Sequence, residues 1–324
     1  MFLRFFKSNQ PLLIILFPFI VFGLWAKSIF GNFDYSTQEN SVLIQLIYSM
    51  FGHNTIVISS VSALLVFAMS YFLVKLNESY ILTDKSSFLP AFFYIVIVSS
   101  VRFVQTQSHV IYATIFLFFA FIQVFGAYKK DEALSKLFNA SLLISIGSFF
   151  YIKLLFFFPV LLIGVIITRA VNWREWAGML IGLMVPFILY FSILFIFDNL
   201  DEVLKSFKND LFYAHTHVVL KLHDIIFLGL LSSLSVFSIF SVFSDYNIKK
   251  IGTRKFLSTL FFLILGVMII YAIFKSNALE LIYFIAIPLS IFLTDYFSNG
   301  RRTWIKEVFF SLLIGIIVYS QIVG

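Results

Sequence analysis

Two carboxylates lie in a short polar stretch that interrupts an otherwise apolar chain. Asp34 and Glu39 belong to "GNFDYSTQEN", residues 31–40, between two long apolar runs. A carboxylate that is partly desolvated at a membrane boundary can have a raised pKa and take the proton of an acceptor hydroxyl as general base. Asp34 is the first candidate for this role and Glu39 the second. The alternative is a helix cap, in which this stretch begins a short interfacial helix over 41–52.

Cationic and polar side chains appear where other apolar runs end. Arg102 closes one run, His109 opens the next, Gln105 lies in the turn between them, and Lys153 separates two further runs. Ionisable groups at membrane depth are costly unless they are paired or face a water-filled cavity, so each marks a candidate site. Guanidinium and ammonium groups hold phosphate, which makes Arg102 and Lys153 phosphate-binding candidates. Alternatively, both side chains extend to lipid headgroups and His109 caps a helix.

The composition indicates which elements must position these residues. Of the 324 residues, 61% are apolar and 12% are charged, whereas soluble domains carry about 25% charged residues. The apolar runs approach the ~20 residues that cross about 30 Å of hydrocarbon, and lipid cannot satisfy exposed backbone groups. The sequence therefore predicts an all-α, polytopic integral membrane protein. The chain contains no cysteine, which excludes disulfides, thiol catalysis and thiolate metal sites.

Apolar length and polar breaks predict about eleven transmembrane helices. They are expected over residues 11–30, 54–74, 88–104, 109–128, 137–152, 154–168, 177–197, 225–244, 256–274, 279–297 and 305–322. With the amino terminus in the cytoplasm, sixteen of the 23 lysines and arginines fall on the cytoplasmic side, as the positive-inside rule requires. The same topology puts the carboxyl terminus outside. The first run is interpreted as a retained helix, because its apolar core reaches Phe30 without the small-residue exit of a signal peptide.

All five histidines fall on the outer side in this topology. They are His53, His109, His215, His217 and His223. The pair in "HTH", 215–217, supplies two ligands, whereas a zinc site needs three or four. A looser metal site with Asp210, His223 and Asp224 is the alternative. We interpret these histidines as surface or substrate-contacting residues, and the first four as residues that shape an outer pocket. The sequence predicts no metal site, and a divalent cation as cofactor stays open.

The cytoplasmic loops exclude several classes of function. The net charge of +7 is divided among short loops, which favours membrane anchoring over nucleic-acid binding. "NIKKIGTRK", 247–255, is expected to be a solvated anchor, and "NWREW", 172–176, an interfacial one. The sequence has no glycine-rich phosphate loop, nucleophile elbow or Ser-His-Asp spacing, which argues against ATP-driven or serine-nucleophile chemistry.

The order of these features resembles the GT-C fold of polyprenyl-phosphate-sugar-dependent membrane glycosyltransferases. The resemblance is carried by a first helix, an acid-bearing outer loop that continues into a short interfacial helix, "FDYSTQENSVLIQLIYSMFGHN", and many spans with short inner loops. The segment 138–187 also looks like a block in uncharacterised bacterial membrane proteins related to that fold. The resemblance implies that Asp34 is the catalytic acid or base and that Arg102 and Lys153 contact the lipid phosphate.

The resemblance also implies a domain organisation and a function. Residues 1–200 would form the GT-C-like module with its first outer loop, 31–53, and residues 201–324 would add outer loop 198–224 and four C-terminal transmembrane helices. The implied function is transfer of a sugar from a polyprenyl-phosphate donor to an acceptor outside the bacterial inner membrane, with no nucleic-acid partner. One alternative is a non-catalytic membrane subunit of an envelope assembly or secretion complex that binds other envelope proteins. The other is a transporter, which requires a polar path across the bilayer.

Overall fold

Every regular element in the described part of the chain is a helix. The computed structural model describes residues 6, 12–31, 43, 54–83, 87–106, 108–196, 203, 205, 207–208, 211, 221–274, 279–298 and 303–323. The helices are α2 (Leu12–Phe30), α4 (Thr55–Tyr80), α5 (Leu89–Ser99), α6 (Arg102–Thr106), α7 (Ser108–Gly126), α8 (Leu134–Ser148), η1 (Ile152–Phe157), α9 (Phe158–Thr168), α10 (Trp173–Ile196), α12 (Leu222–Ser244), η2 (Tyr246–Ile248), α13 (Ile251–Phe274), α14 (Ile282–Ser298) and α15 (Thr303–Val323). The predicted all-α class is confirmed.

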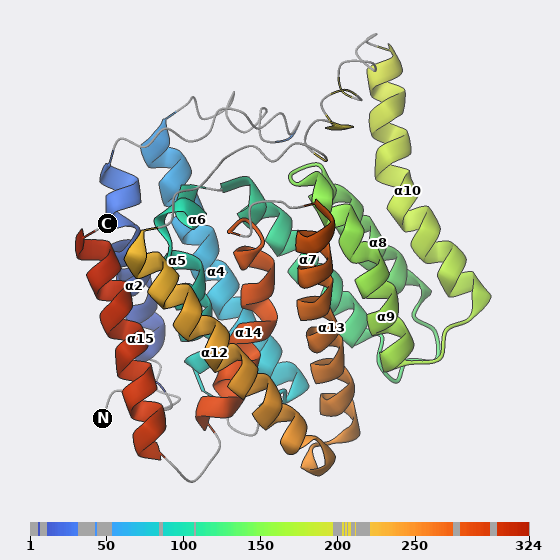
Figure 1. The fold of residues 1–324 in the computed structure, drawn as a ribbon. Helices are drawn as coiled ribbons and strands as arrows, with labels where there is room; N and C mark the ends of the chain where they lie inside the picture. Colours follow the sequence, from blue (N-terminus) through green and yellow to red (C-terminus); the bar gives the residue numbers. More distant parts are fainter. Residues whose placement is uncertain are drawn as a thin grey trace.

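Eleven of the described helices coincide with the eleven predicted apolar runs, and successive long helices run in opposite directions (Figure 1). The last residues of α2, α8, α10 and α13 and the first residues of α4, α9, α12 and α14 lie toward the upper end of the view. We call this the outer end, because the sequence assigns these helix termini to the outer side, and we call the opposite one the inner end. The structure therefore gathers at one end the helix termini that the predicted topology requires there.

Two predicted span boundaries differ from the structure. The third span was expected over residues 88–104, but α5 ends at Ser99 and Arg102 begins the separate short helix α6. The expected turn at Lys153 is instead the 3-10 helix η1, which continues directly into α9. At Lys153, the short helical turn satisfies its own backbone groups, whereas an open turn would leave them unpaired.

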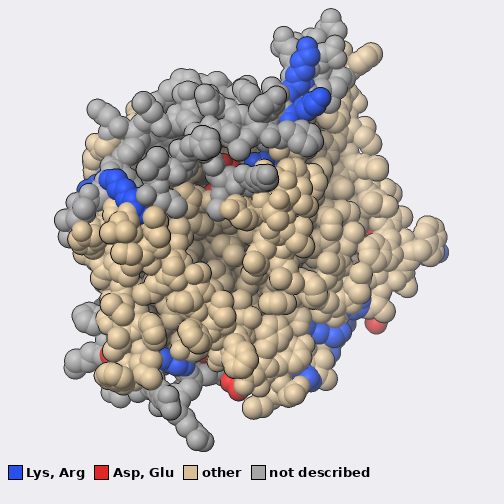
Figure 2. Space-filling view, in the orientation of Figure 1, with Lys and Arg blue, Asp and Glu red and all other residues tan. Residues whose placement is uncertain are grey.

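By length and composition, six of the described helices are able to cross a membrane. They are Thr55–Tyr80, His109–Gly126, Trp173–Ile196, Leu222–Ser244, Ile251–Phe274 and Trp304–Gln321. At about 1.5 Å per residue, helices α5 and α14 are shorter than the roughly 30 Å thickness of the hydrocarbon core. Nearly all residues of these two helices are buried within the protein. On the face in Figure 2, charged side chains gather toward the two ends and uncharged ones cover the middle. These features are compatible with a multi-pass membrane protein.

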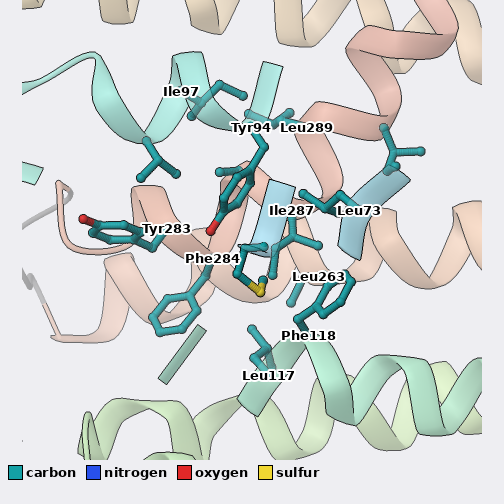
Figure 3. Packing of buried hydrophobic residues seen from close by; sticks show 14 of the residues in the cluster. Leu73, Tyr94, Ile97, Leu117, Phe118, Leu263, Tyr283, Phe284, Ile287 and Leu289 are labelled. Carbon is teal, nitrogen blue, oxygen red and sulfur yellow. The ribbon is translucent and has the colours of Figure 1, made fainter. Parts of the chain in front are cut away.

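The centre of the core lies where α5 and α14 pack against each other. Tyr94 from α5, Phe284 and Ile287 from α14, and Phe118 from α7 meet there with exposures of 2% or less (Figure 3). The surrounding apolar side chains form one cluster with members from α2 through α15. The start of α14 is therefore held by the protein interior.

Glycines allow two pairs of helices to approach closely. A Cβ atom on Gly182 of α10 would lie 2.5 Å from the backbone oxygen of Phe138 on α8. A Cβ atom on Gly164 of α9 would lie 2.7 Å from the Thr259 methyl group of α13. Real Cβ atoms do not come so close to other atoms, so both contacts depend on glycine. Small residues at helix contacts are typical of membrane proteins, because helices in lipid associate largely through close packing.

A buried ion pair lies at the inner end. Lys249 Nζ is 2.6 Å from Asp295 Oδ1, and the two side chains are 3% and 2% exposed. Lys249 lies between η2 and α13, so the pair attaches the α12–α13 connection to the last turn of α14. The expectation that 247–255 is a solvated anchor is wrong for Lys249, because an acid from another helix compensates the burial of its charge. The neighbouring Lys250 is exposed.

Candidate functional site

Four chemistry-bearing side chains meet at the outer end around Tyr151. The Tyr151 hydroxyl donates a hydrogen bond of 3.0 Å to Glu280 Oε2. Lys153 Nζ lies 5.7 Å from the centroid of the Tyr151 ring, and the centroid of the His109 ring also lies 5.7 Å from it. Tyr151, Lys153 and His109 are each buried. We call His109, Tyr151, Lys153 and Glu280 the outer cluster.

Three helix termini position the outer cluster. His109 lies in the first turn of α7, Tyr151 and Lys153 lie at the start of η1, and Glu280 comes just before α14. Phe284, in the first turn of α14, packs its ring 5.7 Å from the Tyr151 ring, measured between centroids. The buried core therefore fixes Tyr151 through Phe284, and Tyr151 in turn contacts the other three members of the cluster.

The outer cluster combines a cation, a carboxylate, a phenol and an imidazole in a largely buried setting. An ammonium group binds phosphate as a point charge, and charge interactions are stronger in a low-dielectric site than in water. The cation also gains from its position near an aromatic ring. The carboxylate, phenol and imidazole are hydrogen-bonding partners for hydroxyl groups. The arrangement can therefore bind a ligand that carries both an anionic group and several hydroxyl groups.

Gln105, a predicted substrate contact, has a buried side chain that forms hydrogen bonds to other residues of the protein. Its side chain is 1% exposed, and its amide nitrogen donates to Ser99 O at 2.9 Å and Leu24 O at 3.3 Å. Its amide oxygen accepts a hydrogen bond from the Ser28 hydroxyl. These bonds attach α6 to α2 and α5. Gln105 therefore positions α6, and none of these three hydrogen bonds involves the outer cluster.

For Arg102, the structure describes the position of the backbone. It is the first residue of α6, and its side chain lies outside what the structure describes. The Tyr283 hydroxyl at the start of α14 donates to Val104 O at 2.8 Å. This bond holds α6 against the helix that follows Glu280. Arg102 therefore begins a helix next to the outer cluster, and its contact with phosphate stays a prediction.

Five predicted site residues lie outside the described residues. They are Asp34, Glu39, His53, His215 and His217. The described helices that flank them terminate at the outer end: α2 ends at Phe30, α4 begins at Thr55, α10 ends at Ile196 and α12 begins at Leu222 (Figure 1). Their proposed roles therefore stay predictions.

The sequence reasoning missed Tyr151 and Glu280. Glu280 carried a usable signal, since it is an acid inside the predicted span 279–297, where an ionisable group marks a candidate site. The same signal marks Asp295. Tyr151 carried none, because tyrosine is common at membrane interfaces. Its importance depends on a fold that brings residues 129 positions apart into contact.

Within the part of the chain that the structure describes, no three His, Cys, Asp or Glu side chains come together as ligands for a metal ion. His223, the fifth outer histidine, lies beside Asp224 instead, with 3.5 Å between Nε2 and Oδ1. Asp224 also accepts a hydrogen bond of 3.2 Å from the backbone nitrogen of Lys221 and so caps α12. The pair is therefore part of a helix start, and a divalent cation stays an untested prediction.

A match over most of the sequence identifies the family of the chain. Residues 36–323 match a family model described as "Family of unknown function (DUF6427)". The chain belongs to this family. The segment shared with the family begins inside the acid-bearing stretch and includes the whole outer cluster, the Lys249–Asp295 pair and Glu39, whereas Asp34 lies two residues before it. No curated protein and no solved structure matches the chain.

Proposed function

We propose that this protein transfers a sugar from a polyprenyl-phosphate donor to an acceptor on the outer side of the bacterial inner membrane. The observation that carries the proposal is the buried Lys153 in the outer cluster. Its ammonium group suits a lipid phosphate, and Glu280 and Tyr151 add hydrogen-bonding groups for sugar hydroxyls. A ligand with a phosphate and a sugar uses both the ammonium group and the hydrogen-bonding groups of this cluster, whereas an inorganic phosphate uses the ammonium group alone.

The proposal includes the full membrane topology. All eleven helices that coincide with apolar runs cross the bilayer, with the amino terminus in the cytoplasm and the carboxyl terminus outside. The alternating helix directions (Figure 1) and the sixteen of 23 basic residues on one side support this topology. The shorter helices α5 and α14 cross within a shell of protein, since almost all their residues are buried.

The chemical step needs one base and one phosphate-binding group. Asp34, with Glu39 as the second candidate, takes the proton of the acceptor hydroxyl, whose oxygen attacks the anomeric carbon of the donor sugar. The bond between that carbon and the phosphate oxygen breaks, and the polyprenyl phosphate leaves with the electron pair. Lys153 and Arg102 stabilise the negative charge on the leaving phosphate. His109, His53, His215 and His217 shape the pocket around the sugar.

A transfer assay tests this function. The full-length protein is reconstituted in bilayers with a radiolabelled polyprenyl-phosphate sugar and an extract of envelope acceptors. Lys153→Gln should weaken donor binding about tenfold or more, since a charge-assisted hydrogen bond is worth about 1.5–3 kcal/mol. Asp34→Ala should lower turnover about 100-fold or more while donor binding persists, because general-base catalysis contributes about 10²–10⁴.

Two exposed residues at the inner end provide matched controls. Lys130→Gln and Asp131→Asn repeat the same changes of charge far from the outer cluster, and both positions are exposed. They should transfer at the wild-type rate. Intact transfer by Asp34→Ala would exclude Asp34 as the base. Wild-type donor binding by Lys153→Gln would show that Lys153 does not bind the donor phosphate, and the proposed function rests on that binding.

A second candidate function is favoured by α10. This helix packs mainly on α8, and its side chains Ile181, Met184 and Ile188 are 55–59% exposed. Such an apolar face contacts either lipid or a helix of another protein. A non-catalytic subunit of an envelope assembly would use it for the partner, and would co-purify with that partner at fixed stoichiometry after mild extraction. Met184→Arg should then release the partner, whereas Lys153→Gln should retain it.

A further inference from the structure

An apolar groove lies between α12 and α13, with α14 as its floor. The two helices are connected through η2 at the inner end and separate toward the outer end (Figure 1). The groove has a volume of about 420 Å³, within the ~300–1,000 Å³ typical of sites for small ligands. Leu228, Leu231 and Ser235 line one wall at helical spacing, and Val267 and Met268 line the other.

The floor of the groove leads to the outer cluster. Leu281, Ile285 and Leu289 of α14 line it and extend over about 12 Å, at about 1.5 Å per residue. This length approaches the depth of one leaflet in a hydrocarbon core of about 30 Å. Leu281 directly follows Glu280 in the chain. The groove is therefore an apolar surface of leaflet depth with a charged cluster at its outer end.

We propose that this groove holds the hydrocarbon chain of a lipid whose phosphate binds at the outer cluster. This inference rests on the proposed function and extends it by naming where the polyprenyl chain lies. Lys153 complements an anionic headgroup, and the groove opens on the side of α12 and α13, two helices long and apolar enough to cross a membrane. The donor then enters sideways from the outer leaflet, between α12 and α13.

Two serines widen the groove without making it polar. The Ser232 hydroxyl donates to Gly229 O at 2.9 Å, and the Ser235 hydroxyl donates to Leu231 O at 2.7 Å. Because both hydroxyls are satisfied within α12, their small side chains leave space for a hydrocarbon chain. A large side chain at Ser232 fills this space. Ser232 is itself exposed, so the change removes no buried contact between helices.

Native mass spectrometry of the full-length protein tests the proposal, with polyprenyl phosphate as the probe and phosphatidylglycerol as the comparison lipid. Ser232→Trp and Met268→Trp fill the groove from two different helices. Ser233→Trp and Ile269→Trp put the same ring at the adjacent positions, which are exposed and do not line the groove. The groove variants should bind polyprenyl phosphate at least tenfold more weakly than wild type, and the control variants within twofold of wild type.

The outcomes separate the groove from the headgroup site. If both groove variants bind polyprenyl phosphate as the controls do while Lys153→Gln loses it, the groove proposal is overturned and the proposed function stands. If the groove variants lose both lipids alike while Lys153→Gln keeps polyprenyl phosphate, the groove holds lipid chains in general. The binding of the phosphate at the outer cluster and the proposed function are then both overturned. Loss of polyprenyl phosphate in the groove variants and in Lys153→Gln supports both.

Discussion

The buried ion pair between Lys249 and Asp295 predicts a large and specific loss of stability. The two charges are 2.6 Å apart and almost fully buried. Removing one partner of such a pair costs about 3–5 kcal/mol, because the other charge is left buried and uncompensated. Asp295→Leu and Lys249→Met should therefore each lower the free energy of unfolding by about 3 kcal/mol. The double variant Lys249→Met/Asp295→Leu should return close to wild type, since neither charge then has to be desolvated.

Unfolding in mixed micelles with increasing sodium dodecyl sulfate, followed by circular dichroism, measures these free energies. The four proteins form a double-mutant cycle, whose coupling energy should be at least about 2 kcal/mol. Lys250→Met is the matched control, because this neighbouring lysine is exposed and its loss should change stability by less than about 0.5 kcal/mol. Single variants that each cost less than about 1 kcal/mol, with no coupling, would show that the pair is solvated and would refute the reasoning.

Two further comparisons use the same unfolding assay. Tyr283→Phe should cost about 1–3 kcal/mol because it leaves the buried oxygen of Val104 without its hydrogen bond. Tyr94→Phe should cost nothing, since the Tyr94 hydroxyl has no hydrogen-bond partner among the described residues; equal costs would contradict the hydrogen-bond assignment. Gly182→Ala should cost about 1–3 kcal/mol by forcing α10 away from α8. Gly229→Ala, where nothing lies within 4 Å of the added atom, should be neutral or stabilising, and the reverse order would exclude close packing as the cause.

The positions of the helices could be predicted because they depend on local properties of the chain. Runs of apolar residues and the polar residues between them are visible in sequence order, and lipid permits few structures other than helices. The predicted run 177–197 therefore became α10, and 256–274 became α13. The ends were less predictable, as Arg102 and Lys153 show, because both residues lie in short helices, α6 and η1, which the lengths of the apolar runs do not indicate.

The partners of the charged residues could not be predicted, because they depend on which helices pack together. Lys249 and Asp295 are 46 positions apart in sequence, and Tyr151 and Glu280 are 129 apart. Each acid lies inside the predicted run 279–297, and that location alone indicates that it needs a partner. Helix packing then determines the partner. This explains why Lys153 and His109 were identified as candidates, whereas the tyrosine that joins them was not.

A cryo-electron microscopy map of the protein in lipid nanodiscs with polyprenyl phosphate tests the central claim most directly. The account predicts phosphate density about 2.7–3.2 Å from Lys153 Nζ, with hydrocarbon density continuing along α14 between α12 and α13. A map in which polyprenyl phosphate binds elsewhere, or in which another polypeptide fills the space beside the outer cluster, would contradict it.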